Sequence, residues 1–287
     1  MKRTPCIFLA SSLTLATSMA SLLTSGIPVL AQTPAPPSTT LDGGIQGIAT
    51  NPPAVLQELL ERQMEAANQQ NLPQLMATYS PTFEHADGLN FDQTEAALQT
   101  LWQHHPQLTY QAEIQSWQKQ GSDLVATVLT EIKGSQVSER GEFQLLSRTT
   151  TLNRYRPNPE ADQQLQLIEQ KVLRESSSLT SGSAPPTVTL QLPESVRPGS
   201  TYSLSAVVDE PLGSNVLLGT AIEESITPKR YTDDASYPLE PLQAGGIFRQ
   251  ADAPSEAGSQ WISVMLVGQS GIRLESRRVI ITDRLLP

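Results

Sequence analysis

The sequence of 287 residues is poor in several residue types, and each shortage argues against a class of protein. Its one cysteine, Cys6, has no partner for a disulfide. Its three histidines never occur at the i, i+4 spacing that zinc-binding helices use. Basic residues number 19 against 29 acidic ones, and the net charge of −10 disfavours binding to nucleic acid or to anionic lipid. Phosphate-binding glycine loops, nucleophile elbows and EF-hand loops are also absent, so no metal and no cofactor is expected.

A long apolar run occurs at the N-terminus. Lys2 and Arg3 precede a stretch of apolar and small residues over residues 7–30, and Ala31 has the small side chain that a signal peptidase reads. This pattern predicts a signal peptide over residues 1–31, cleaved after Ala31. Export to the periplasm or another extracytoplasmic space follows, or to a thylakoid lumen if the host has one; a retained membrane anchor is the alternative. Cleavage removes the cysteine and leaves 17 basic against 29 acidic residues, so ordinary cores must supply the stability.

Composition divides the rest of the chain into a tether, two domains and a linker. Residues 32–53 are rich in Pro, Thr, Ser and Gly and have little to bury, which is typical of a disordered tether. A second stretch rich in Ser and Pro predicts a linker over residues 179–186. The two predicted domains, residues 54–178 and 187–287, are each of a normal size for one hydrophobic core.

The first domain opens with three segments of helical periodicity. Asn51 is expected to cap the first helix, and Asn71 precedes the second, which Pro81 closes. The third helix is predicted to begin at Asp92, with Glu95 completing a capping box. The apolar faces of the three helices are Leu56, Leu59, Leu60, Met64 and Ala67; Leu72, Leu75, Met76 and Tyr79; and Leu98, Leu101, Trp102 and His105.

Beyond the third helix the apolar residues alternate, which indicates strands. Residues 108–115 and 124–132 predict a hairpin with its turn at 119–122, and residues 142–155 predict a third strand. Residues 163–175 fit either a strand or a helix; a strand is predicted because a sheet that wraps helices needs a closing strand. The first domain is therefore predicted to be an α+β cone, in which three helices are wrapped by a curved antiparallel sheet around an internal pocket.

The second domain is predicted to be all-β. Alternating runs separated by Pro and Gly turns suggest a β-sandwich. The predicted strands are residues 188–192, 202–208, 216–226, 246–249, 261–267 and 278–282. Residues 254–264 resemble the corner and penultimate strand of bacterial immunoglobulin-like domains, and the resemblance implies an immunoglobulin-like sandwich.

Residues 66–83, AANQQNLPQLMATYSPTF, resemble the helix–turn–helix entry of the nuclear transport factor two-like superfamily. This superfamily includes the polyketide-cyclase-like (SnoaL-like) and ketosteroid-isomerase-like proteins. The order of predicted strands is similar too, and the resemblance extends over about 125 residues of the chain. It rests on pattern rather than on an invariant motif, so it implies a fold more than an activity.

Catalytic members of this superfamily place an aspartate general base inside the cone, often with tyrosine, aspartate or histidine partners. For this chain the resemblance implies His85 and Asp87 as base and orienting partner, with Tyr79 or Tyr110 as a hydrogen-bond donor. An extended segment would place Phe83, His85 and Asp87 on one side, although the dipeptide that begins at Asp87 is an equally good turn signal. The expected ligand pocket is lined by Tyr79, Phe83, Trp102, His105 and Tyr110.

Three functions fit these patterns. The favoured one is a non-catalytic envelope protein whose cone binds a small apolar molecule or an envelope protein, and whose sandwich docks to another protein. The second is an isomerase or cyclase that uses His85 or Asp87, and the third is a structural adaptor whose cone is filled by side chains. An apolar cavity that contains a bonded His85 and Asp87 favours the enzyme, a cavity without them the binder, and no cavity the adaptor. A homodimer through residues 149–155 of the cone sheet is a further hypothesis.

Overall fold

The computed structural model describes residues 51–138, 141–160, 163–209, 217–233, 235–242 and 245–284. Residues 1–50, which carry the predicted signal peptide and most of the predicted tether, lie outside these ranges. Within them, none of the helices combines the length and the apolar character that a membrane span requires.

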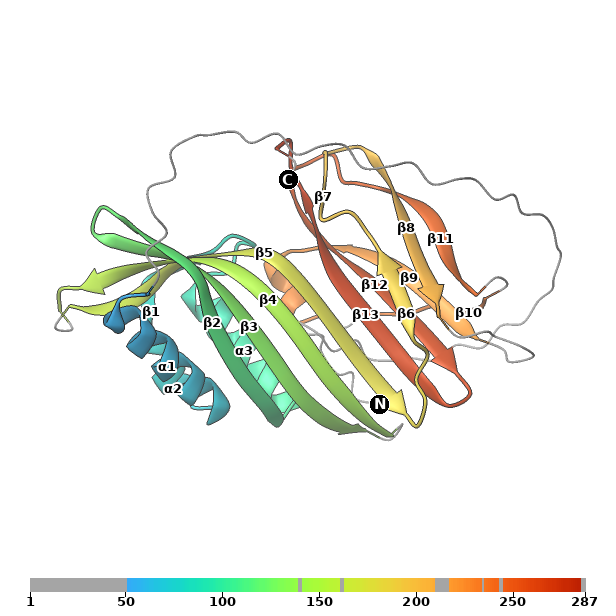
Figure 1. Cartoon of the computed structure of the whole chain (residues 1–287), viewed down its shortest axis with the longest axis horizontal. Coiled ribbons are helices and arrows are strands. Elements are labelled where there is room, and N and C mark those ends of the chain that lie inside the picture. The colour runs from blue at the N-terminus through green and yellow to red at the C-terminus, as the bar shows by residue number, and fades with distance from the viewer. Residues whose placement is uncertain are drawn as a thin grey trace.

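The chain forms an N-terminal unit of helices and long strands and a C-terminal unit of shorter strands (Figure 1). The N-terminal unit consists of α1 (Ala54–Asn68), α2 (Leu72–Met76), β1 (Tyr79–His85), α3 (Phe91–His104), β2 (Gln107–Gln120), β3 (Asp123–Ser138), β4 (Gly141–Asn158) and β5 (Gln164–Gly182). The C-terminal unit consists of β6 (Val188–Gln191), β7 (Ser195–Val196), β8 (Thr201–Val208), β9 (Leu218–Ser225), the 3₁₀ helix η1 (Pro228–Tyr231), β10 (Glu240–Pro241), β11 (Gly246–Asp252), β12 (Gly258–Gly268) and β13 (Gly271–Ile281).

The three predicted helices are present, but two of their caps differ from the prediction. Asn71 caps α2 as predicted, by accepting a hydrogen bond from the Gln74 backbone, whereas α1 begins after Pro53 without any side-chain cap. The capping box of α3 uses Asn90 and Gln93, not Asp92 and Glu95. Both pairs have the same spacing, and the earlier pair is used because Asn90 has extended backbone angles.

The end of α2 also corrects the prediction. The helix stops at Met76, and Tyr79 and Pro81 belong to β1, which the sequence did not predict as a strand. β1 pairs in parallel with β5, and its register shifts between Tyr79 and Glu84. Pro81 falls within this irregularity, where its missing N–H interrupts no regular ladder.

Strands β2 to β5 form the predicted antiparallel order, with β2 next to β3, β3 next to β4 and β4 next to β5. A two-residue turn joins β2 to β3, and its Gly121 has a φ of +64°, so the predicted hairpin is confirmed. The ambiguous segment after residue 163 is β5, in which Val172 pairs with Thr151 of β4. The described part of the chain is mostly antiparallel sheet with few helices, as an α+β cone requires.

The six predicted strands of the C-terminal unit correspond to β6, β8, β9, β11, β12 and β13, whereas β7, β10 and the first seven residues of β13 were not predicted. β11, β8 and β6 form a three-stranded sheet, whereas β9, β10, β12 and β13 belong to the large sheet. Side chains from both sheets meet in one buried core, whose members include Leu204, Ala206, Ile262, Val264 and Val279. The two-layered arrangement is thus observed, and the immunoglobulin-like assignment stays a prediction.

One sheet of ten strands runs through both units, because β13 pairs with β5 from Arg277↔Ser176 to Gly271↔Gly182 (Figure 1). Residues 179–182 of the predicted linker are therefore strand, held between β4 and β13. A Ser-rich segment is a flexible linker when no adjacent strand can hydrogen-bond to its backbone. Here β4 and β13 lie on either side of the segment and pair with it, so it forms a strand. The predicted division into domains stays a prediction.

A buried apolar cluster also crosses the junction between the units. It joins Leu101 and Leu145 of the N-terminal unit to Tyr237, Met265 and Leu274 of the C-terminal unit. Buried apolar area of this kind contributes stability roughly in proportion to its size, at about 25 cal/mol per Å². The two units are consequently joined by backbone pairing and by a common core.

Candidate functional site

A cavity of about 170 Å³ lies in the N-terminal unit, between the helices and one face of the sheet. It is lined by Leu60, Gln63, Met64, Ala67, Leu75, Tyr79, Leu98, Leu101, Tyr110, Val128, Thr130, Ile132, Leu145, Ser147, Thr149, Thr151, Asn153, Leu167 and Gln170. None of these described residues is a histidine or carries a charge. The cavity is therefore an uncharged site whose only ionisable side chains are two tyrosines.

The periodicities of the elements explain why these side chains meet. On α1, Leu60, Met64 and Ala67 recur at helical spacing, so they lie along one face. On β4, every second residue from Leu145 to Asn153 points inward, because successive strand residues face opposite sides. The helices contribute an apolar wall, whereas the sheet contributes hydroxyl and amide groups.

Tyr79 and Tyr110 line the cavity, as predicted. The Tyr79 hydroxyl has no hydrogen-bond partner among the described residues, and burial raises the pKa of Tyr79 to about 12. The Tyr110 hydroxyl accepts a hydrogen bond of 2.8 Å from the indole Nε1 of Trp102, and burial also raises the pKa of Tyr110. Both phenols stay protonated near neutral pH and can donate a hydrogen bond to an oxygen atom in the cavity.

Phe83, Trp102 and His105 do not line the cavity, contrary to the prediction. Phe83 is buried in the neighbouring core and packs edge-on against Tyr79, with ring centroids 4.9 Å apart. Trp102 is buried and supports Tyr110 through its indole. These side chains form a layer behind the lining.

His105 is fully buried at the C-terminal end of α3. Neither of its ring nitrogens has a hydrogen-bond partner in the described part of the chain. Burial, with a smaller contribution from the neighbouring His104, lowers the pKa of His105 to about 4. The ring is thus a neutral, buried group that costs stability, because neutral imidazole still has one donor and one acceptor to satisfy.

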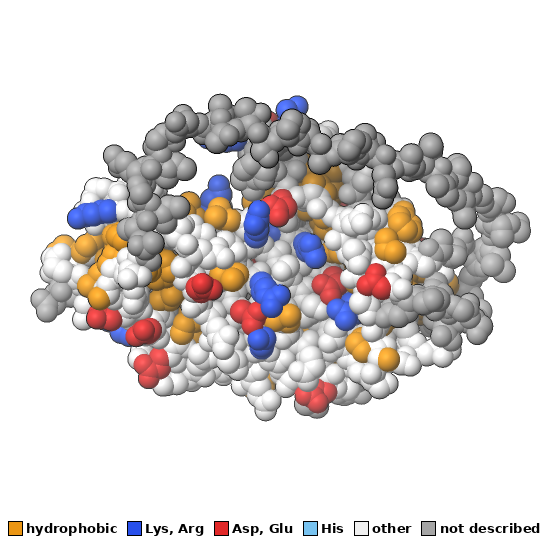
Figure 2. Space-filling view, in the orientation of Figure 1, with side chains coloured by type: hydrophobic (Ala, Val, Ile, Leu, Met, Phe, Trp, Pro, Cys, Tyr) orange, Lys and Arg blue, Asp and Glu red, His pale blue; other side chains and the backbone are white. Residues whose placement is uncertain are grey.

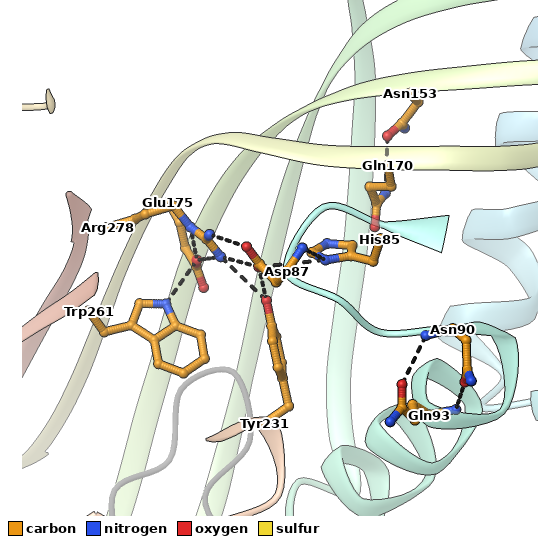
Figure 3. A network of polar contacts seen from close by, with 10 residues as sticks. All are labelled: His85, Asp87, Asn90, Gln93, Asn153, Gln170, Glu175, Tyr231, Trp261 and Arg278. Carbon is orange, nitrogen blue, oxygen red and sulfur yellow. Dashed lines mark hydrogen bonds and ion pairs between the residues drawn. The ribbon is translucent and has the colours of Figure 1, made fainter. Parts of the chain in front are cut away.

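His85 and Asp87 are brought together, but outside the lining of the cavity, at the junction of the two units (Figure 3). The Asp87 carboxylate accepts hydrogen bonds of 2.9 Å from Nη1 and Nη2 of Arg278. It also accepts one from the hydroxyl of Tyr231. His85 Nδ1 accepts from the Asp87 backbone N–H at 3.1 Å and lies 3.5 Å from the carboxylate.

The same guanidinium binds a second carboxylate. Nε of Arg278 donates to Glu175 of β5 at 2.9 Å, and the indole of Trp261 donates to the same oxygen at 3.0 Å (Figure 3). Arg278 and Glu175 are each only 6% exposed. A buried cation thus lies between two buried carboxylates from the other unit, and hydrogen bonds to both satisfy it.

The electrostatics of this cluster fix the charge of each predicted catalytic residue. Burial opposes ionisation of Asp87, but the hydrogen bonds and charge of Arg278 outweigh it, so the pKa of Asp87 lies below its usual value. Burial lowers the pKa of His85, and the charge of Arg278 adds to this effect against the attraction of Asp87. Asp87 is therefore an ionised and fully bonded carboxylate, which suits it to holding the junction together.

Sequence reasoning did not find Glu175, Tyr231, Trp261 or Arg278. Arg278 was predicted only as the start of a strand, and 191 residues separate it from Asp87. A pairing over such a distance leaves no local signal in spacing or composition.

Comparisons with known proteins give a partial picture. A family model described as a domain of unknown function, DUF8623, matches residues 183–282. No curated protein matches the chain.

Solved structures resemble part of the chain. A protein of unknown function with a cystatin-like fold from Nostoc punctiforme has a TM-score of 0.32 and 9% identity, covering 41% of this chain and 86% of its own. A ketosteroid isomerase-like protein from Erwinia carotovora atroseptica has a TM-score of 0.32 and 14% identity, covering 42% and 92%. A SnoaL-like polyketide cyclase from Shewanella denitrificans OS-217 has a TM-score of 0.30 and 16% identity, and the match covers 42% of this chain and 90% of the cyclase.

Bd1075 of Bdellovibrio bacteriovorus has a TM-score of 0.34 and 9% identity, covering 41% of this chain and 39% of its own. The chain thus spans about two fifths of Bd1075. Because the identities and TM-scores of all these likenesses are low, no activity of this chain follows from them.

Proposed function

We propose that the chain is an exported, non-catalytic binding protein whose N-terminal unit holds a small apolar molecule in its cavity. The observation that carries this proposal is the composition of the lining, which has apolar, hydroxyl and amide side chains but no charged residue and no histidine. Ligand sites are mostly apolar with a few polar groups that orient the ligand. A cavity without His85 and Asp87 is also the outcome that favours binding over catalysis.

Acid–base catalysis lacks support in this cavity. A general base must ionise near the working pH and lie within hydrogen-bond reach of the reacting atom. The ionisable groups of the lining are Tyr79 and Tyr110, whose pKa values burial raises. The carboxylate of Asp87 is already occupied by Arg278 and Tyr231. The isomerase or cyclase hypothesis is therefore the weaker one.

The size of the cavity limits its ligand. At about 170 Å³, it is close to the 150 Å³ of an engineered apolar cavity that binds benzene, and below the range of roughly 300 to 1,000 Å³ for drug-sized ligands. A ligand of this volume is a small molecule rather than a peptide segment. The presence of a cavity also weighs against an adaptor whose cone is filled by side chains.

Native mass spectrometry of the protein purified gently from its own host tests the proposal. The wild type is expected to carry a small added mass, which Thr149→Trp should lose because an indole in the middle of the lining fills the space. Leu152→Trp is the matched control, since Leu152 lies on the same strand and is 38% exposed outside the cavity. Bound mass that survives Thr149→Trp would place the ligand elsewhere, and an apo mass for the wild type would favour the adaptor.

Export is proposed from the sequence of residues 1–31 alone. N-terminal sequencing of the protein from its host is expected to begin at Gln32. A chain that retains Met1 in a membrane fraction would instead support a retained anchor.

Docking to an envelope protein and a homodimer through the cone sheet are also proposals. Figure 2 has the orientation of Figure 1 and shows acidic, basic and hydrophobic side chains intermingled on the face of the molecule that is turned to the viewer. On β4, the residues flanking the exposed Leu152 include Arg148 and Arg154, which form ion pairs with Glu131 and Glu169. Size-exclusion chromatography with light scattering tests the homodimer, which Leu152→Arg should dissociate.

A further inference from the structure

The cavity is longer along β4 than across the sheet. It contacts β2 at Tyr110 and β5 at Leu167 and Gln170. Strand pairing puts Tyr110 in the row of Ser147, through Ile132, whereas Gln170 pairs with Asn153. Ser147 and Asn153 are six residues apart on β4, which is about 20 Å of extended strand.

Helix α1, which covers this face of the sheet, runs along the same long direction of the cavity. The side chain of Asn68, at the end of α1, donates to the Tyr110 backbone at 3.0 Å. One turn and more earlier, Gln63 donates to the hydroxyl of Thr78, the neighbour of Tyr79. α1 therefore runs from the Tyr79 end to the Tyr110 end of the cavity.

A space of about 170 Å³ that reaches both ends must be narrow. A compact space of the same volume would contact roughly two or three successive inward positions of one strand. Here β4 lines the cavity at every inward position from Leu145 to Asn153. The shape suits a single extended chain better than a compact ring system.

The two ends differ in polarity. Gln63, Tyr79, Asn153 and Gln170 gather at one end, where Gln170 donates to Asn153 and Asn153 donates to Tyr155. The Tyr79 hydroxyl takes no part in these bonds and is a donor without a partner among the described residues.

The other end is mainly apolar. Its lining includes Leu98, Leu101, Ile132 and Leu145, and the C-terminal unit packs against it through the shared apolar cluster. Two hydroxyls are the polar exceptions there: that of Ser147, which has no partner within the described residues, and that of Tyr110, which accepts from Trp102.

We propose that this cavity takes an uncharged lipid with a single chain, whose polar head lies at the Tyr79 end and whose chain runs along β4 toward Leu145. The inference rests on the proposed binding function and names its ligand class. A charged head is excluded because an ionised group buried without a counter-charge is strongly unfavourable, and the lining offers no counter-charge. Fatty alcohols, aldehydes and primary amides meet these requirements.

Isothermal titration calorimetry of the wild-type protein with 1-alkanols of six to twelve carbons tests the shape. Each methylene that enters the cavity is expected to lower Kd about fourfold, which corresponds to about 0.8 kcal/mol, until the cavity is full. Beyond a definite chain length, each further methylene should no longer lower Kd. A Kd that does not change with chain length would overturn the inference.

Two ligands of similar carbon number complete the test. Decahydro-2-naphthol, a compact alcohol, and decanoate, a charged chain, are each expected to bind at least tenfold more weakly than 1-decanol. If decahydro-2-naphthol binds as tightly, the cavity is compact, and the chain inference falls while the proposed function stands. If decanoate binds as tightly, the uncharged head is wrong. If none of the three binds, the proposed function fails as well.

Variants place the ligand in the cavity. In Leu145→Trp, Kd should stop falling at a shorter alkanol than in the wild type, because the indole blocks the apolar end of the cavity. Tyr79→Phe should weaken 1-decanol about tenfold and leave the chain length at which Kd stops falling unchanged, because it removes the donor to the head. Leu152→Trp, on the outer face, should change neither quantity. Loss of all binding in Leu145→Trp, with its thermal unfolding intact, would indicate a compact site.

Discussion

Arg278 of β13 holds the carboxylate of Asp87 through two hydrogen bonds of 2.9 Å, although 191 residues separate them. The same guanidinium binds Glu175 of β5. The contact therefore joins the last strand of the C-terminal unit to the loop after β1 and to the strand that closes the N-terminal unit. Asp87, which a resemblance implies as a catalytic residue, is thus bonded across the junction of the two units, and His85 lies beside it.

Removing the cation from this cluster should destabilise the protein strongly. Arg278→Met leaves Asp87 and Glu175 buried without their partner, and breaking a buried pair typically costs about 3–5 kcal/mol. Urea unfolding monitored by circular dichroism measures the change. Arg174→Met is the control, because its pair with Glu194 is largely exposed and should contribute about 1 kcal/mol or less. Similar losses for the two variants would contradict a structural role for the cluster.

The unsatisfied ring of His105 should make stability depend on pH. Its folded pKa of about 4 lies below the unfolded value of 6.5, so between these values the unfolded state binds a proton that the folded state does not. The free energy of unfolding is therefore highest, as far as His105 is concerned, above pH 6.5. It falls toward pH 4 by on the order of 3 kcal/mol from this residue.

His105→Leu isolates that contribution. The variant should be at least as stable as the wild type at pH 7, because leucine has no polar atoms to satisfy, and its advantage should grow as the pH falls to 4. Chemical denaturation at several pH values measures the difference. His104→Leu serves as the neighbouring control, and a parallel pH profile for wild type and His105→Leu would refute the prediction.

The bond between Trp102 and Tyr110 should contribute to the core. Tyr110→Phe leaves the indole N–H of Trp102 buried without its acceptor, which typically costs about 1–3 kcal/mol. Tyr202→Phe is a matched control, since the Tyr202 hydroxyl is buried without a partner among the described residues and its removal should cost little. Thermal unfolding of both variants decides the comparison, and equal midpoints would count against the bond.

The N-terminal unit is not expected to fold well on its own. A fragment of residues 51–178 loses the pairing of β5 with β13, the partner of Asp87, and the apolar residues that pack against Leu101 and Leu145. It should show lower cooperativity and faster proteolysis than residues 51–287, measured by urea denaturation and limited trypsin digestion. A cooperative transition at the same urea midpoint would instead establish two independent domains, as the composition predicted.

The sequence by itself determined most of the elements of this protein and their order, although β1, β7 and β10 were not predicted. Helical spacing predicted α1, α2 and α3, and alternation predicted the hairpin of β2 and β3 and six of the eight strands described in the C-terminal unit. The inward positions of Tyr79 and Tyr110 were also predictable. These features depend on neighbours a few residues apart, which is the range over which periodicity carries information.

Tertiary structure decided what lies next to what. It paired the Ser-rich end of β5 with β13, added β1 in parallel, and took His85 and Asp87 out of the cavity lining. It also chose Asn90 over Asp92 as the cap of α3, although both have a suitable partner three residues later. The physical reason is that backbone pairing, burial and the solvation of charge depend on residues far apart in the chain, such as Asp87 and Arg278.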